Sequence, residues 1–208
     1  YDPRLHRARG QRGQIHIADA VLQLIEGSTF VDGAHRVQDA YSLRCAPQVH
    51  GAAVDTLAFV ESVIQAEINA ATDNPLIFDP GIAISGGNFH GEPVGLVMDF
   101  LGIALAELGA ISERRTFRLT DGNLNTNLPP MLVDSPEAAG LNSGLMMPQY
   151  TAASLVLENQ TLAHPDSVHS LPTSGEQEDH NANAMTASRH ARQIVSNVRH
   201  ILAIELYT

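Results

Sequence analysis

The chain has 208 residues and a mass of 22.3 kDa, enough for one good-sized core or two small ones. Its formal net charge of −11 argues against nucleic acids and anionic membranes as partners, because both attract basic surfaces. The longest apolar stretch, 94–111, is interrupted by Asp99 and Glu107, and a single cysteine excludes an internal disulfide. We therefore expect a globular protein of a reducing, cytoplasmic compartment, without a membrane span or signal peptide.

Two helices and one hairpin are predicted in the first part of the chain. Apolar residues recur at three- and four-residue steps over 14–26, which is typical of a helix. A second helix is expected from Pro47, a favoured first-turn residue, to about Ala70. Short apolar segments at 76–78 and 82–84 flank a turn sequence and predict a small β-hairpin.

The remaining elements are also helices. A long helix is expected from about Glu92 to Arg118, and its many Gly and Ala residues indicate close contact with other helices. A loop at 120–144 leads to two more helices, at about 148–163 and 181–206. We predict one all-α unit over residues 1–208, a bundle of long helices with one hairpin. Helices this long exceed the usual globular length and indicate a bundle shared among subunits.

The common cofactor and metal motifs are absent from the sequence. It has no glycine-rich dinucleotide or phosphate loop, no His-Glu-x-x-His and no Cys-x-x-Cys. Its 10 histidines are scattered without a metal-ligand spacing. We therefore expect no metal site.

The first polar cluster that could carry chemistry contains Gln38, Tyr41 and Arg44. These residues are three apart, so a helical turn would stack them on one face. An amide, a phenol and a guanidinium on one face could bind a carboxylate and handle a proton. A solvated helix face explains the same spacing.

Two further clusters have structural explanations beside the functional ones. Gly86 and Gly87 allow unusual backbone angles from which Phe89 would project as a wall, or they form a tight turn into a helix. The acidic segment 176–179 precedes a predicted helix, where capping and the helix dipole explain it. A buried carboxylate in this segment with a raised pKa could instead act as a base.

Taken together, the clusters belong to a set of segments that run in family order over nearly the whole chain. The set resembles the C-terminal part of the aromatic amino acid ammonia-lyases, and histidine ammonia-lyase most closely. The segments that carry the resemblance are Arg36–Val49, Thr72–Leu76, Ser85–Pro93, Ser112–Arg115, Gly140–Gly144, Leu171–Ser174 and Gln177–His180.

This resemblance implies both a fold and a reaction. The fold would be the long-helix bundle of the ammonia-lyases and fumarases. The reaction would eliminate ammonia from an α-amino acid to give a trans-α,β-unsaturated acid, here L-histidine to trans-urocanate. The family uses an electrophile, 4-methylidene-imidazol-5-one (MIO), which forms autocatalytically from an internal Ala-Ser-Gly.

The resemblance also implies roles for five residues. Arg44 would pair with the substrate carboxylate, and Tyr41 would handle the proton near the β-carbon. Gln38 would hold the surrounding polar network, and Phe89 would pack against the MIO group and the substrate. Glu178, which we expect to be catalytic together with Tyr41, matches the acidic residue that distinguishes histidine lyases. A carboxylate is a suitable partner for an imidazole, and the Gln of phenylalanine and tyrosine lyases is not.

The sequence departs from the family in one respect: it contains no Ala-Ser-Gly. Thr173-Ser174-Gly175 is similar in composition, but its neighbours match a different family segment. We therefore expect an N-terminal chain of the same enzyme to supply the electrophile, within a tetramer-like homo-oligomer. The start at Tyr1, without Met, also leads us to expect a fragment or a processed product.

Three alternatives remain open. A tyrosine or phenylalanine ammonia-lyase, or an aminomutase that returns the amine to the β-carbon, would use the same scaffold. A non-catalytic helical scaffold fragment is the third, although such a fragment would not need Gln38, Tyr41, Arg44, Phe89 and Glu178 together.

Overall fold

The structure is a computed structural model that describes residues 1–31, 37–138 and 140–208. Its elements in chain order are α1 (Pro3–Arg9), α2 (Arg12–Leu24), α3 (Tyr41–Arg44), α4 (Ala46–Glu67), β1 (Leu76–Phe78), β2 (Ile82–Ile84), α5 (Glu92–Thr120), the 3-10 turns η1 (Pro130–Leu132) and η2 (Pro136–Ala138), α6 (Met146–Leu162), the 3-10 turn η3 (Ser174–Glu176) and α7 (Ala184–Tyr207). The all-α bundle with one small hairpin is confirmed.

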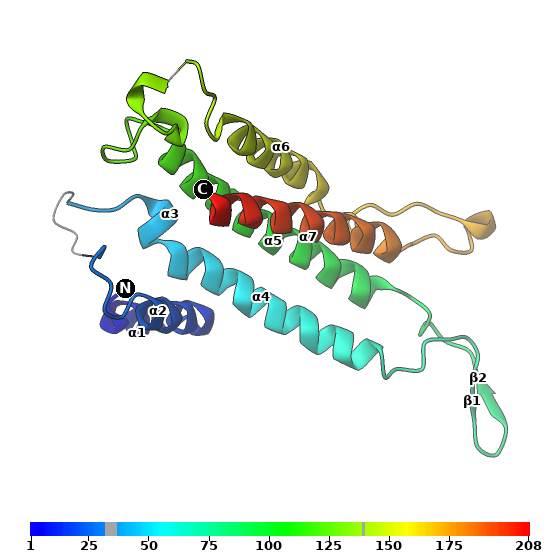
Figure 1. The fold of residues 1–208 in the computed structure, drawn as a ribbon. Coiled ribbons are helices and arrows are strands. Elements are labelled where there is room, and N and C mark those ends of the chain that lie inside the picture. The colour runs from blue at the N-terminus through cyan, green and yellow to red at the C-terminus, as the bar shows by residue number, and fades with distance from the viewer. Residues whose placement is uncertain (32–36, 139) are drawn as a thin grey trace.

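The bundle is built around α5 (Figure 1). This helix packs against α4, α6 and α7, while α2 packs on α4 and α1 on α2. The antiparallel strands β1 and β2 pair Leu76 with Ile84 and extend beyond one end of the bundle, as does the loop that precedes α7. Both chain termini lie toward the opposite end (Figure 1).

The core lies along the contact between α5 and α7. Ile194 and Ile201 of α7 are fully buried. A Cβ at Gly109 of α5 would lie 3.2 Å from Ile201 Cδ1, and one at Gly102 would lie 3.3 Å from Ile194 Cδ1. The small residues of α5 therefore bring the two helices together, as their abundance predicts.

The crossing of α2 and α4 is closer still. A Cβ at Gly13 would lie 2.1 Å from the Gly51 carbonyl oxygen, so only glycine fits there. The Gly13 N–H also donates to the Asp55 carboxylate, at 2.9 Å to Oδ1. Backbone contact and a hydrogen bond from α4 thus fix α2 at this point.

By length and composition alone, α5 could cross a membrane, despite Asp99 and Glu107. Contrary to our expectation, these two charges do not by themselves exclude a membrane span. The packing of α5 is that of a central bundle helix, since three other helices contact it. It also buries the polar side chains of Asp99, Ser112 and Glu113.

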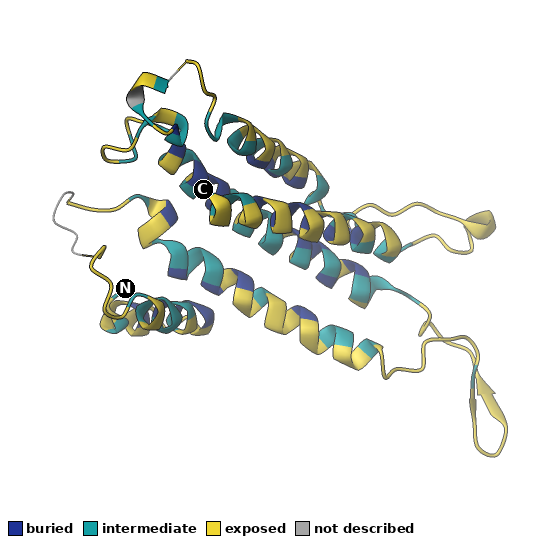
Figure 2. Ribbon diagram, viewed as in Figure 1, coloured by how far each residue is buried: buried dark blue, intermediate teal, exposed yellow. Residues whose placement is uncertain are grey.

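Many residues of the helices are exposed (Figure 2), and they include large apolar side chains. On α4, Leu57 and Phe59 are 53% and 50% exposed, and Leu206 at the end of α7 is 91% exposed. A groove of about 690 Å³ between α4 and α5 is lined by apolar residues that include Phe59, Phe100 and Ile103. Exposed side chains of this kind are typical of a surface that other polypeptide covers.

The structure corrects the predicted elements at several points. The short helix α1 was not predicted; it begins where the Asp2 side chain accepts a hydrogen bond from the Arg4 N–H. The second predicted helix ends at Glu67 rather than Ala70. The last begins at Ala184 rather than 181, because Asn183 adopts a left-handed conformation, with φ of 51°. The loop at 120–144 contains two 3-10 turns, η1 and η2.

Candidate functional site at two ends of the bundle

Tyr41 and Arg44 lie on the single turn of α3. The Arg44 guanidinium carbon is 4.7 Å from the centre of the Tyr41 ring, and Arg44 Nε donates to the Asp39 carbonyl at 3.0 Å. Both side chains are exposed, Tyr41 to 71%. This turn therefore presents a phenol beside a guanidinium, as the spacing predicts.

Gln38 does not belong to this turn, which corrects the prediction that a helical turn stacks all three residues. The helix begins at Tyr41, and Gln38 lies in a bend before it, with its side chain exposed. Arg36, the first residue of the matching family segment, lies outside the described residues.

Two long-range hydrogen bonds hold the α3 turn to the bundle. Arg115 of α5 donates to the Ser42 carbonyl at 3.3 Å, and the Tyr1 hydroxyl donates to the Leu43 carbonyl at 2.6 Å. Burial raises the pKa of the Tyr1 phenol, and the nearby Asp39 carboxylate adds to this effect. The side chains of Tyr41 and Arg44 are therefore exposed, while hydrogen bonds from Arg115 and Tyr1 hold the backbone of the turn.

Phe89 lies at the other end of the bundle, in the loop that leads into α5. The segment turns at Gly87, where the His90 N–H donates to the Gly87 carbonyl at 3.0 Å. This confirms the predicted tight turn, although neither Gly86 nor Gly87 uses a positive φ. Phe89 is 57% exposed.

Glu178 lies in the loop before α7, also at this second end. Its carboxylate accepts a hydrogen bond from Thr173 Oγ1 at 2.8 Å, and the backbones of the two residues form an antiparallel bridge. The interpretation of segment 176–179 as a helix cap is wrong, because α7 begins only at Ala184. The alternative of a buried carboxylate is also wrong, since Glu178 is exposed.

Asn181 organises the loop around Glu178. Its side-chain amide donates to the Glu178 carbonyl at 3.2 Å and to the Leu171 carbonyl at 2.5 Å, and its N–H donates to Ser170 Oγ. Sequence reasoning missed this role, although the residue directly follows a family segment. Its place three residues after Glu178 is the sequence signal that could have identified it.

A histidine pair joins the Phe89 and Glu178 loops. The His90 and His180 rings are stacked, with centres 5.8 Å apart and planes 7° from parallel. His90 Nδ1 accepts from the Glu92 N–H at 3.3 Å, which leaves Nε2 as the donor to the His180 carbonyl at 3.0 Å. The fold therefore brings Phe89 and Glu178 to one end of the molecule.

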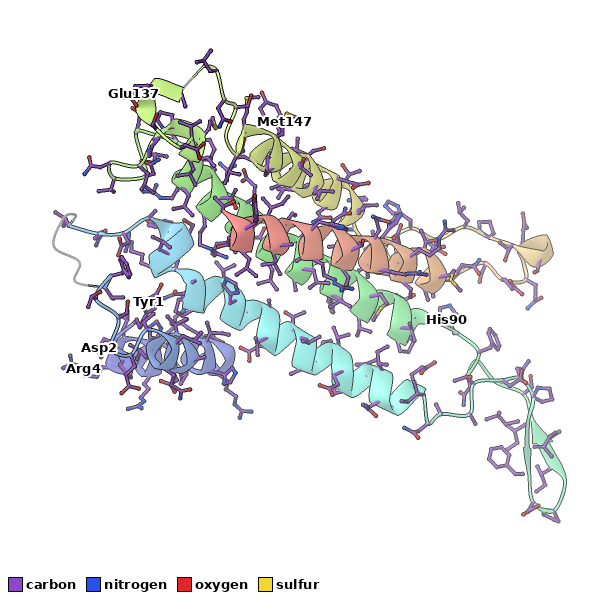
Figure 3. All side chains as sticks on the ribbon, viewed as in Figure 1. Tyr1, Asp2, Arg4, His90, Glu137 and Met147 are labelled. Atoms are coloured by element: carbon purple, nitrogen blue, oxygen red, sulfur yellow. The ribbon has the colours of Figure 1, made fainter. Side chains whose placement is uncertain are left out.

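The α3 turn and the Phe89–Glu178 end lie far apart. The α5 helix rises roughly 35 Å between Glu92, beside the Phe89 loop, and Arg115, beside α3. Figure 3 shows the same separation, with Tyr1 near the α3 end and His90 at the other. The five predicted site residues thus fall into two groups within one chain, Gln38, Tyr41 and Arg44 toward one end and Phe89 and Glu178 at the other. We refer to these two groups as the half-sites.

Side chains that could hold a metal ion together do not gather in the described part of the chain. Within residues 1–31, 37–138 and 140–208, no group of three or more His, Cys, Asp or Glu side chains could hold a metal ion. The groove between α4 and α5 contains none of the five predicted site residues. The two half-sites therefore remain the places where chemistry is expected.

A family model described as aromatic amino acid lyase matches residues 1–208. The chain belongs to the aromatic amino acid lyase family. Histidine ammonia-lyase from Treponema denticola is 54% identical to it over 209 residues, which cover all of this chain and 41% of the relative. This member of the aromatic amino acid lyase family thus spans about two fifths of the length of the curated relatives it matches.

Solved structures of the aromatic amino acid lyase family share the fold. Histidine ammonia-lyase from Trypanosoma cruzi matches with a TM-score of 0.88 and 44% identity, over 99% of this chain and 38% of that one. Phenylalanine aminomutase from Pantoea agglomerans matches with a TM-score of 0.91 and 32% identity, over 99% and 44% of the two chains. Lyases and aminomutases have the same fold here, so the fold alone does not select the reaction.

Proposed function

We propose that this chain is the C-terminal portion of a histidine ammonia-lyase, which converts L-histidine to trans-urocanate and ammonia. The observation that carries the proposal is the arginine–tyrosine pair on α3, because it places a carboxylate-binding group beside a proton-handling group. The identity of about 54–56% to enzymes named histidine ammonia-lyase supports this choice of substrate.

The elimination breaks two bonds of the amino acid. The β-proton leaves to a base, the Cα–N bond breaks with its electron pair going to ammonia, and a double bond forms between Cα and Cβ. Arg44 would fix the substrate carboxylate through two parallel hydrogen bonds, and Tyr41 would handle the β-proton. Gln38, at the entrance to the turn, would hold the polar network around them.

Glu178 would determine the substrate specificity. Its carboxylate, oriented by Thr173, is a charged acceptor suited to an imidazole N–H. Phenylalanine has no hydrogen-bonding group on its ring, so it would give this carboxylate no hydrogen bond. A site built to hydrogen-bond its substrate rejects an analogue that lacks the bonding group.

Phe89 fits the role of a wall for the MIO group. Its ring is 57% exposed at the tip of a loop whose backbone is held by the His90 turn, so it offers a free planar face. Once formed, MIO would be the electrophile that accepts electron density from the substrate. Its precursor Ala-Ser-Gly does not occur in this sequence, so we expect an N-terminal chain of the enzyme to provide it.

The separation of the two half-sites supports a homo-oligomer, tetramer-like as in the family. An amino acid is far smaller than the roughly 35 Å of α5 that lies between them, so one chain cannot offer both half-sites to one substrate. We infer that each active site combines the α3 turn of one copy with the Phe89–Glu178 end of another. The exposed apolar residues of α4 would be covered in that assembly.

Subunit complementation tests this arrangement. Two inactive variants of the complete enzyme, Tyr41→Phe and Glu178→Gln, are co-expressed and the mixed oligomers are purified. If a site takes one half from each of two copies, random mixing leaves about one quarter of the sites with both wild-type halves, and activity returns in that proportion. Mixed oligomers as inactive as the single variants would contradict shared sites.

A matched control uses two variants of the same half-site. Tyr41→Phe mixed with Arg44→Lys, assayed at a histidine concentration well below KM, should show no more activity than the average of the two single variants, because both residues come from one α3 turn and no site receives both in wild-type form. Recovery of activity in this pair would mean that subunit mixing does not report which half-sites combine in one active site.

Turnover assays separate the alternatives. The assembled enzyme is offered L-histidine, L-tyrosine and L-phenylalanine separately, and the products are identified. Urocanate from histidine alone is expected. Cinnamate or coumarate would indicate a phenylalanine or tyrosine lyase, β-amino acids an aminomutase, and no turnover by the complete assembly a non-catalytic scaffold. A cytoplasmic location also stays a prediction.

A further inference from the structure

Arg115 connects three parts of the bundle. It lies on α5, where its Nε and Nη2 form a forked ion pair with the Glu205 carboxylate near the end of α7, at 2.8 Å for Nη2. Its remaining nitrogen, Nη1, donates to the Ser42 carbonyl of α3. The side chains of Arg115 and Glu205 are only 17% and 22% exposed, so this ion pair is largely shielded from water.

Glu205 is itself held in place. Ser112, one turn before Arg115 on α5, donates its hydroxyl to Glu205 Oε2 at 2.5 Å. The carboxylate thus accepts from a hydroxyl and from two guanidinium nitrogens. A carboxylate so constrained orients the planar guanidinium, which directs Nη1 at α3.

The α3 turn depends on such tethers for its position. It has only four residues, and Tyr41, Leu43 and Arg44 are all exposed. Ser42 alone is buried, and its carbonyl is the one that Arg115 holds. Besides its chain connection to α4, the turn is therefore joined to the bundle by two hydrogen bonds to its backbone carbonyls, from Arg115 and Tyr1.

We propose that Arg115 is a positioning residue for the reaction: by holding the Ser42 carbonyl it sets where Tyr41 and Arg44 stand relative to the substrate. This inference rests on the proposed function, because it gives those two residues their roles. A reacting group misplaced by about 1 Å can cost about 100-fold in rate, so one tether is enough to matter.

The test is Arg115→Lys in the complete enzyme. A lysine ammonium can keep the charge interaction with Glu205, but it lacks the fork that reaches Ser42 as well. We expect kcat per folded enzyme to fall at least 10-fold and KM for histidine to rise several-fold, with little change in melting temperature. Arg114→Lys is the matched control: Arg114 is the preceding residue on α5 and pairs with Glu113 instead, so kcat and KM should both stay at their wild-type values.

A double-mutant cycle distinguishes positioning from bulk packing. In a Tyr41→Phe background, Arg115→Lys should cost much less in kcat than it does alone, because both changes act on the same group. If the fold-loss in kcat of the double variant equals the product of the two single losses, the inference is overturned. Should Arg115→Lys fail to fold, Glu205→Gln provides the same test, since it weakens the orientation of Arg115 and leaves the guanidinium present.

Amide hydrogen exchange tests the hydrogen bond between Arg115 and Ser42 without an activity assay. The N–H groups of Leu43, Arg44 and Cys45 are bonded within the α3 turn, to the carbonyls of Ala40 and Tyr41. Arg115→Lys should speed their exchange about 10-fold and leave α5 and α7 unchanged. Unchanged exchange in α3, or faster exchange throughout the bundle, would overturn the inference. A wild-type enzyme inactive on histidine would refute the proposed function instead, and the exchange result would still decide the role of Arg115.

Discussion

The Asp99 carboxylate of α5 accepts the backbone N–H of Ser167 at 2.8 Å, and with its other oxygen it accepts that of Asp166 at 3.1 Å. Asp99 is only 7% exposed, so it anchors the first residues of the Glu178 loop to the central helix. A charge inside an otherwise apolar helix thus holds a loop that carries a predicted site residue.

Asp99→Asn is expected to loosen this loop. An amide can accept only one of the two hydrogen bonds and presents its own N–H groups to the other donor, which leaves a buried group unsatisfied. We expect a loss of about 1–3 kcal/mol in the free energy of unfolding. Denaturant titration, and faster amide exchange at Asp166 and Ser167, would show it. The exposed Glu107→Gln on the same helix is the control; equal effects from both variants would contradict the anchoring role.

Gly51→Ala should separate α2 from α4. A Cβ at this position would lie 2.3 Å from the Gln14 nitrogen, so the two backbones must move apart. The cost is expected to be at least about 1–3 kcal/mol in unfolding free energy, as for overpacked cores. At Gly86 a Cβ meets nothing within 4 Å, and Gly86→Ala should change stability by less than about 0.5 kcal/mol. A neutral Gly51→Ala would mean that this crossing is not as close as described.

Arg44→Lys should weaken substrate binding and leave the fold intact. A point charge replaces the planar fork that matches a carboxylate, so KM for histidine is expected to rise about 10-fold or more. Steady-state kinetics of the assembled enzyme measure this effect. Arg9→Lys, an exposed arginine on α1, should behave as wild type. An unchanged KM in Arg44→Lys would remove Arg44 from the carboxylate site.

Tyr41→Phe should mainly lower turnover. The change removes the phenol oxygen but keeps the ring beside Arg44, so kcat is expected to fall about 100-fold or more while KM changes little. The side chain is 71% exposed, so the melting temperature should not move. Tyr207→Phe, at a tyrosine that is 76% exposed on α7, is the control. Turnover at the wild-type rate would exclude Tyr41 from the chemistry.

His50 should lower the free energy of unfolding at acidic pH. Burial lowers the pKa of its imidazole below the ordinary value of 6.5, and the Arg115 cation adds to this, while Glu205 opposes it. The unfolded chain therefore binds the proton more readily, so this contribution is complete above pH 6.5 and is lost as the pH falls below that value. Between pH 5 and 8, the unfolding free energy of His50→Gln should depend less on pH than that of the wild type. His16→Gln is the control, because His16 is exposed, and it should keep the wild-type pH dependence. Identical pH profiles for wild type and His50→Gln would contradict this shift.

Local signals were sufficient for most elements. Proline at the first turn predicted the start of α4, and the apolar segments around Asp79-Pro80-Gly81 predicted the hairpin with its bounds. Helix ends were less predictable, as at Asn183, because a left-handed residue depends on contacts made by the folded loop: the Asn183 side chain donates to the carbonyls of Asp166 and His169.

The sequence by itself determined the class of fold, the family and the residue types of the candidate site, since these follow from periodicity and from ordered segments. Only the tertiary structure decided that Tyr41 and Glu178 lie at opposite ends, because the three long helices between them, α4, α5 and α6, each carry the chain along the bundle. It also decided which residues support them. Arg115 and Ser42 are 73 positions apart, and Asp99 and Ser167 are 68 apart; no local pattern predicts hydrogen bonds that form only when distant segments pack together.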